Sequence, residues 1–162
     1  MLHRDIKLSN LFLKEDGRVK LGDFGIAKVL TDKSKKAKSI VGSPYYLAPE
    51  IIQAKPYDYS AEVWAIGVLT YYLCTLSPPF QSSNRELSGL FKNIRNGKPK
   101  SLPEYYSKDI WNMIKCMLKK EPAERPKINQ IMKHPLLIKR IKQMEIDHPS
   151  SMPAQSVVNG HS

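Results

Sequence analysis

Residues 63–76 read VWAIGVLTYYLCTL, an apolar run of 14 residues that only two threonines and two tyrosine hydroxyls interrupt. A helix on a protein surface shows polar residues at every third or fourth position, and this run does not. A bilayer-spanning helix needs about 18 or more apolar residues, so the run is too short for a membrane span. Ser60 is placed to cap the helix start, and Ser77-Pro78-Pro79 stops it. The stretch therefore predicts a buried central helix, beginning near Ala61, in a mostly helical domain.

Length and composition set the class of protein around that helix. A chain of 162 residues suits one domain, and its 41% hydrophobic content can build one core. Cys74 and Cys116 lie far apart in the sequence, so we expect two free, buried thiols in a reducing compartment. No secretory signal is found at Met1, which runs directly into a polar stretch. These features predict an intracellular protein, cytoplasmic or nuclear.

The formal net charge of +11 raises the possibility of a nucleic-acid partner. The positive residues form two clusters, one over residues 28–38 and one over residues 119–142. No nucleic-acid-binding motif accompanies either cluster, and a soluble protein with basic loops accounts for both. A nucleic-acid binder would show an affinity that falls steeply with salt. We expect neither a nucleic-acid partner nor a membrane partner.

Two short apolar runs near the N-terminus predict a β-hairpin. Residues 11–13 and residues 19–21 flank Lys14-Glu15-Asp16-Gly17-Arg18, and Asp-Gly is a strong hairpin signal. If the runs pair, Asn10 falls beside Gly22 and Asp23, because paired strands lie about 5 Å apart. Mg²⁺ prefers oxygen ligands. The hairpin therefore predicts that the oxygen-bearing side chains of Asn10 and Asp23 lie together at its open end, where they could bind Mg²⁺.

Four motifs in one order indicate a family. Residues 3–10, HRDIKLSN, match the catalytic-loop pattern H-R-D-x-x-x-x-N, and residues 23–25 are D-F-G. Residues 48–50 are A-P-E, and a late arginine, Arg125, follows. The chain resembles the eukaryotic protein kinases over residues 2–144. The runs VGSPYYLAPEI, LCTLSPPF and HPLLIKRIKQ are most similar to the NIMA-related serine/threonine kinases.

The resemblance implies roles for the catalytic loop. Asp5 would orient the substrate hydroxyl and accept its proton, and Lys7 would neutralise charge on the transferred phosphoryl group. Asn10 and Asp23 would hold Mg²⁺ on the phosphates of ATP. Phe24 would report the active or inactive state through its packing. The implied cofactors are ATP and Mg²⁺, and the implied partner is a protein with a serine or threonine hydroxyl.

The resemblance also identifies residues 26–47 as an activation loop. Its residues are mostly polar and basic, without periodicity, which is equally typical of a solvated connector. A phosphate on Ser39 would pair with Arg4. Ser43 would take the place of the residue that contacts the catalytic aspartate. Lys7 points to serine/threonine rather than tyrosine specificity.

Three further positions are implied to be structural. Arg125 would pair with Glu50 and anchor the wall against which the substrate rests. Trp64 is the large aromatic residue expected in the central helix. Glu62 departs from the family, which has aspartate there to hold the catalytic-loop backbone. An added methylene at a packed site typically costs about 1–3 kcal/mol, so catalytic-loop geometry comes into question.

The remaining sequence predicts surface helices and a tail. Residues 85–96 carry apolar residues at helical spacing, and Ser107 can cap a helix that follows. A last helix near residues 128–133 and the segment PLLIKRIKQM close the domain. The sequence becomes rich in serine, proline and glycine from residue 147, so we expect a domain over residues 1–144 and a disordered tail over residues 145–162.

The 162 residues contain neither G-x-G-x-x-G nor V-A-I-K, the motifs of the kinase small lobe. We therefore expect a mainly α large (C-terminal) lobe with the small lobe absent, from a truncated product or an incomplete gene model. The lobe would transfer the ATP γ-phosphoryl group only when a small lobe is present. The alternative is a non-catalytic binding module or pseudokinase-like scaffold. Apolar residues near Leu11 and Phe24 would be uncovered, which predicts self-association.

Overall fold

The computed structural model describes residues 3–22, 44–83 and 86–147. Its contacts divide the chain into two units, residues 1–127 and residues 128–162, and each unit is described by itself.

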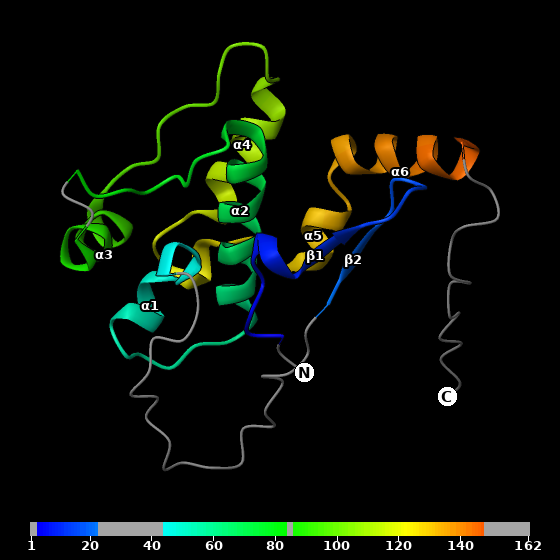
Figure 1. Ribbon diagram of the computed structural model, residues 1–162. Coiled ribbons are helices and arrows are strands. Elements are labelled where there is room, and N and C mark those ends of the chain that lie inside the picture. The colour runs from blue at the N-terminus through cyan, green and yellow to red at the C-terminus, as the bar shows by residue number, and fades with distance from the viewer. Residues whose placement is uncertain (1–2, 23–43, 84–85, 148–162) are drawn as a thin grey trace, which may run out of the picture. The chain divides into compact units, whose positions relative to one another are not determined.

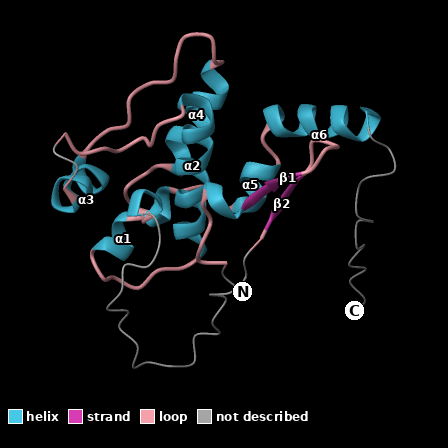
Figure 2. Cartoon of the chain, viewed as in Figure 1, coloured by secondary structure: helices cyan, strands magenta, loops and turns pink. Residues whose placement is uncertain are grey.

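In its described residues the first unit is built mainly of helices, with one two-stranded sheet, as Figure 1 shows by position in the chain and Figure 2 by type of structure. Its elements are η1 (Leu8–Asn10), β1 (Leu11–Leu13), β2 (Val19–Leu21), η2 (Pro44–Tyr46), α1 (Pro49–Ile52), α2 (Tyr59–Thr75), α3 (Leu87–Asn96), α4 (Lys108–Met117) and η3 (Pro122–Glu124).

Helix α2 is the expected central helix, and eight of its residues are buried, among them the fully enclosed Trp64. It starts two residues earlier than predicted, and its N-cap is Asp58 rather than Ser60. The Asp58 carboxylate accepts a hydrogen bond from the Ser60 N–H at 2.9 Å, which satisfies one free donor of the first turn. The last turn is not enclosed, because Leu73 is 54% exposed.

Helix α4 packs against α2 at a glycine. A Cβ atom added at Gly67 would lie 2.8 Å from Met117 Cβ and 3.1 Å from a Leu118 methyl group. Glycine within a helix costs about 0.5–1 kcal/mol relative to alanine, and here it permits the two helices to approach closely. Ser107 caps α4 as predicted, since its hydroxyl accepts the Ile110 N–H at 3.4 Å.

The predicted hairpin is confirmed. Strand β1 pairs antiparallel with β2, with Leu11 opposite Leu21 and Leu13 opposite Val19. Gly17 has a φ of +77° in the turn, a conformation that residues with side chains rarely adopt. The Gly22 N–H donates to the Asn10 carbonyl at 2.8 Å, so the pairing continues one step beyond the strands.

The second unit consists, in its described part, of α5 (Ile128–Met132) and α6 (Pro135–Asp147). Helix α6 ends at Asp147, three residues past the expected domain end at residue 144, and the domain and tail bounds stay predictions. Residues 148–162, the rest of the predicted tail, lie outside the described residues.

The two cysteines differ in exposure. Cys74 on α2 is partly buried, and burial raises the pKa of its thiol. Cys116 on α4 is exposed, which corrects the expectation of two buried thiols. No helix in the ranges described above is long and apolar enough to cross a membrane.

Candidate functional site

The predicted catalytic-loop residues lie together before the hairpin. The Lys7 Nζ is 2.7 Å from Asp5 Oδ2, and the Asn10 amide donates to the same oxygen at 3.0 Å. The Asn10 amide also donates to the Asp5 carbonyl at 2.8 Å. The Asp5 side chain is 14% exposed and that of Lys7 is 23% exposed, so both groups still reach solvent. One carboxylate is thus oriented by an ammonium and an amide, at a position open to an incoming group.

Glu62 of helix α2 holds the backbone that precedes this cluster. One oxygen, Oε1, accepts hydrogen bonds from the N–H groups of His3 and Arg4, the latter at 3.0 Å. The longer side chain therefore reaches both amides that the shorter aspartate of the family was expected to hold. Glu62 therefore holds the catalytic-loop backbone despite its added methylene.

Arg4 adopts a strained backbone conformation at this point. Its φ of +66° is in the left-handed region, which costs a residue with a side chain on the order of 1–3 kcal/mol. The two hydrogen bonds to Glu62 offset part of this cost. The Arg4 Nε is buried and has no hydrogen-bond partner among the described residues. A buried guanidinium donor without a partner is suited to bind an anion.

The end of the hairpin presents one of the two predicted metal ligands. The Asn10 amide nitrogen is engaged by Asp5, which leaves the amide oxygen as the group that can bind a cation. An oxygen donor of this kind fits Mg²⁺. Asp23 lies outside the described residues, one position after Gly22, whose backbone is paired with Asn10. Within the described ranges no cluster of three or more His, Cys, Asp or Glu residues could hold a metal ion.

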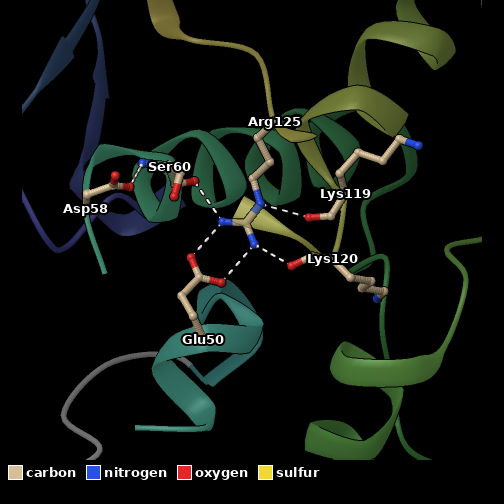
Figure 3. A network of polar contacts seen from close by, with 6 residues as sticks. All are labelled: Glu50, Asp58, Ser60, Lys119, Lys120 and Arg125. Atoms are coloured by element: carbon tan, nitrogen blue, oxygen red, sulfur yellow. Dashed lines mark hydrogen bonds and ion pairs between the residues drawn. The ribbon is translucent and has the colours of Figure 1, made fainter. Parts of the chain in front are cut away.

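Arg125 forms a buried clamp between distant parts of the chain (Figure 3). Its Nη1 lies 2.7 Å from Glu50 Oε1 and its Nη2 lies 2.8 Å from Glu50 Oε2. The remaining N–H groups donate to the carbonyl oxygens of Lys119 at 2.8 Å, Ser60 at 3.0 Å and Lys120 at 3.0 Å. All five guanidinium donors are used. The predicted pair of Glu50 and Arg125 is therefore present, with side-chain exposures of 4% and 0%.

Two cations lie on an aromatic stack beside this clamp. The rings of Trp64 and Phe80 stack with centroids 5.5 Å apart. The Arg125 guanidinium lies 5.1 Å from the Trp64 ring, and the Lys120 Nζ lies 4.0 Å from the Phe80 ring. Lys120 also donates to the Ile94 carbonyl at the end of α3. Burial and the nearby Arg125 charge lower the pKa of Lys120 from 10.5 to about 8.

A groove of about 860 Å³ begins at Lys7. Its walls come from the catalytic loop, η2, α2 and the start of α3, and its larger side chains are Tyr45, Tyr46, Tyr72, Leu87, Leu90 and Glu86. The Tyr46 hydroxyl accepts a hydrogen bond from the Leu8 N–H at 3.4 Å, which links η2 to the catalytic loop. The groove is large enough for a peptide segment and adjoins the Asp5 cluster.

The hairpin exposes apolar side chains on both faces, because Leu13 and Val19 pair on one face and Phe12, which pairs with Lys20, lies on the other. Phe12 is 57% exposed, Leu13 75% and Val19 59%. The prediction of an uncovered surface named Leu11, which is partly buried, and Phe24, which lies outside the described residues. The exposed apolar residues are therefore Phe12 and Leu13, one and two positions beyond Leu11, and Val19 on the other strand.

Several predicted site residues are not placed. Asp23, Phe24, Ser39 and Ser43 lie outside the described residues, so their roles stay predictions. Sequence reasoning missed the groove and the Lys120 contact with the aromatic stack. Tyr45 and Tyr46 are neighbours in the sequence, but the other groove residues, such as Tyr72 and Leu90, are distant from them, and no local pattern links these positions. Lys120 lies in a basic run whose members look alike in the sequence.

Comparison with known proteins agrees with the geometry. Residues 1–137 match the protein kinase domain family. Serine/threonine-protein kinase Nek1 of Mus musculus is 41% identical over 143 residues, which are 88% of this chain and 12% of that protein. Probable serine/threonine-protein kinase nek2 of Dictyostelium discoideum is 38% identical over 147 residues, 91% of this chain and 34% of that protein.

Serine/threonine-protein kinase Nek2 of Homo sapiens is 41% identical over 138 residues, which are 85% of this chain and 30% of that protein. The chain thus spans between 12% and 34% of the length of these three relatives. The family match covers most of the chain and includes the Asp5 cluster and the Arg125 clamp. The chain therefore belongs to the protein kinase domain family, and within it to the NIMA-related kinases.

Proposed function

We propose that this chain is the large lobe of a serine/threonine protein kinase, which transfers the γ-phosphoryl group of ATP to protein hydroxyls when joined to a small lobe. The observation that carries the proposal is the cluster of Asp5, Lys7 and Asn10, held in place through Glu62. The relatives named above are serine/threonine kinases, which supports the same class of reaction.

Each residue of the cluster has a defined task. The Asp5 carboxylate orients the substrate hydroxyl and accepts its proton. Lys7, 2.7 Å from that carboxylate, neutralises charge on the phosphoryl group in transfer. Asn10 and Asp23 would hold Mg²⁺. When bound, that ion neutralises charge on the phosphates of ATP. Catalysis in this class is mainly positioning and charge stabilisation, so the hydrogen bonds that fix Asp5 matter as much as its basicity.

The remaining predicted residues have supporting roles. The buried Arg4 Nε supports its assignment as the partner of a phosphate on Ser39. Ser43 would contact Asp5, and Phe24 would report the active state. The clamp of Glu50 and Arg125 would anchor the substrate wall, with Trp64 beneath it. The groove at Lys7 supports a protein substrate that lies in extended form. An intracellular site of action, without a nucleic-acid or membrane partner, stays a prediction.

A chimera tests the proposal. The small lobe of human Nek2, joined before His3, should give a protein that transfers labelled phosphate from ATP to a protein substrate. Asp5→Asn should lower the rate by about 10²–10⁴-fold, the usual contribution of a positioned base. The unjoined chain should transfer none. A chimera whose rate is unchanged by Asp5→Asn, or transfer by the unjoined chain that Asp5→Ala abolishes, would contradict the proposal.

A non-catalytic binding module is the second candidate, favoured by the exposed hairpin surface around Phe12, Leu13 and Val19. Its protein partners should be retained when Asp23→Ala removes the predicted metal ligand. Partners that are lost whenever nucleotide is removed would count against this candidate and in favour of the kinase.

A further inference from the structure

Lys120 binds the end of helix α3. The last carbonyl groups of an α-helix have no partner within the helix, and Ile94 lies in the last turn of α3. The Lys120 Nζ donates to the Ile94 carbonyl oxygen at 2.5 Å, although the two residues are 26 positions apart. A cation at this end of a helix also faces the negative end of the helix dipole. Lys120 therefore fixes the end of α3 to the segment that carries the Arg125 clamp.

The main chain of Lys120 is part of the clamp itself (Figure 3). Its carbonyl oxygen accepts a hydrogen bond from Arg125 Nη2 at 3.0 Å, and the same guanidinium binds Glu50 on α1. The Lys120 Nζ lies 4.0 Å from the centre of the Phe80 ring and 5.2 Å from that of the Trp64 ring. One residue therefore contacts both the anchor of α1 and the end of α3.

The groove at Lys7 has one wall from η2 and another from α3. Helix α1 begins three residues after η2 ends, so the pair of Glu50 and Arg125 anchors the chain next to the first wall. Helix α3 contributes Leu87 and the buried Leu90 to the second wall. The width of the groove depends on where α1 and α3 are held, and Lys120 takes part in both attachments.

Stability does not account for a lysine at this position. Burial lowers the pKa of Lys120 to about 8, so its charged form is held there at a cost. An uncharged side chain of similar length, such as methionine, would cover the two aromatic rings without this cost. The ammonium group adds a directed bond to one carbonyl oxygen of α3. A buried ion that is retained at a cost can specify one geometry among several.

We propose that Lys120 is a positioning residue for the protein substrate, because it holds α3 at the distance from η2 that an extended substrate segment requires. The inference rests on the proposed function, since it concerns the groove in which that substrate would lie. Lys120 is not among the described residues that line the groove. Its loss should therefore weaken substrate binding and leave the chemical step unchanged.

The first measurement uses the complete 162-residue chain without ATP. In Lys120→Met, hydrogen exchange of the α3 amides should become faster by at least about fivefold, the effect of one lost hydrogen bond on a local opening equilibrium. The amides in the core of α2 should keep their rates. Lys119→Met is the matched control, because it removes the same charge one residue away from a side chain that is 53% exposed. Lys120→Arg keeps a cation with N–H donors and should stay within about twofold of the unaltered chain.

The second measurement uses the chimera with the small lobe of human Nek2, with dephosphorylated casein as the protein substrate. Lys120→Met should raise the KM for casein by about three- to tenfold and leave kcat and the KM for ATP within about twofold, because only substrate binding is altered. A merely structural role would lower the amount of active enzyme, and so the apparent kcat, without changing the KM for casein. Lys119→Met should leave all three constants unchanged, and Lys120→Arg should restore the KM for casein.

Circular dichroism and urea denaturation show whether each variant is folded. If Lys120→Met is unfolded, Lys120→Gln is judged in its place, because it removes the charge and keeps a polar end. The inference is overturned if a folded variant leaves α3 exchange or the KM for casein unchanged in an active chimera, or if Lys119→Met has an equal effect. A chimera that transfers no phosphate even with Lys120 present overturns the proposed function, and the inference with it.

Discussion

The Arg125 clamp and the β-hairpin differ in how fully their groups find partners within the chain. Every N–H group of Arg125 has an acceptor, and both members of the ion pair with Glu50 are buried. The hairpin leaves Phe12, Leu13 and Val19 more than half exposed. The groups of the clamp therefore need no partner outside the chain, whereas the exposed hairpin side chains are suited to contact another surface.

The largest expected effect is the loss of the clamp. Arg125→Ala leaves the Glu50 carboxylate buried without its partner, so the free energy of unfolding should fall by about 3–5 kcal/mol. Urea denaturation followed by tryptophan fluorescence measures it, since Trp64 lies under the guanidinium. Lys119→Ala, at a side chain that is 53% exposed, is the control and should change little. If the free energy of unfolding falls no more in Arg125→Ala than in Lys119→Ala, the clamp does not contribute more to stability than an exposed residue does, and the contrast with the hairpin fails.

A smaller effect is expected at Glu62, which joins helix α2 to the catalytic loop. Glu62→Ala leaves the N–H groups of His3 and Arg4 without their acceptor. The free energy of unfolding should fall by about 1–3 kcal/mol, the usual cost of an unsatisfied buried donor. Hydrogen exchange at these two amides should become faster, while the core of α2 keeps its protection. Glu62→Gln retains an acceptor oxygen and should resemble the unaltered chain. Unchanged exchange in Glu62→Ala would show that the loop is held by other contacts.

The pH dependence of stability tests whether Lys120, beside the clamp, is buried with a lowered pKa. The pKa of Lys120 is about 8 in the folded chain and 10.5 when solvated, so the unfolded chain binds more protons between these values. The free energy of unfolding should therefore gain a contribution that rises from pH 8 to pH 10.5. Cysteine and tyrosine groups also titrate in this window, so the measured quantity is the difference between variants. Lys120→Met should remove the rise and Lys119→Met should keep it; equal profiles would mean that Lys120 is solvated.

The smallest effect on stability is expected on the hairpin. Leu13→Ser with Val19→Thr changes exposed side chains, so the free energy of unfolding should move by no more than about 0.5 kcal/mol for each substitution. Self-association, measured by sedimentation velocity at several concentrations, should fall. Leu73→Ser alters a similarly exposed residue on α2 and should leave association unchanged. A chain that is monomeric at high concentration before any substitution would contradict the expected association.

Some features could be predicted from local sequence, and others could not. The hairpin was predictable because Asp-Gly and two apolar runs set its register within about ten residues. Ser107 was correctly identified as a cap, whereas Asp58 displaced Ser60 because either side chain can satisfy the first turn of α2. Cys116 looked like a core residue because free cysteines are usually buried, but its position on α4 faces outward.

The sequence by itself determined the family, the order of the catalytic residues and the buried central helix, because each of these follows from a short motif or from a run of apolar residues. Only the tertiary structure decided that Glu62 reaches two catalytic-loop amides, that Arg125 uses all five of its donors, and that Lys120 lies on an aromatic ring. These contacts join residues up to 75 positions apart. Their geometry depends on how helices and loops pack, which no local pattern of residues specifies.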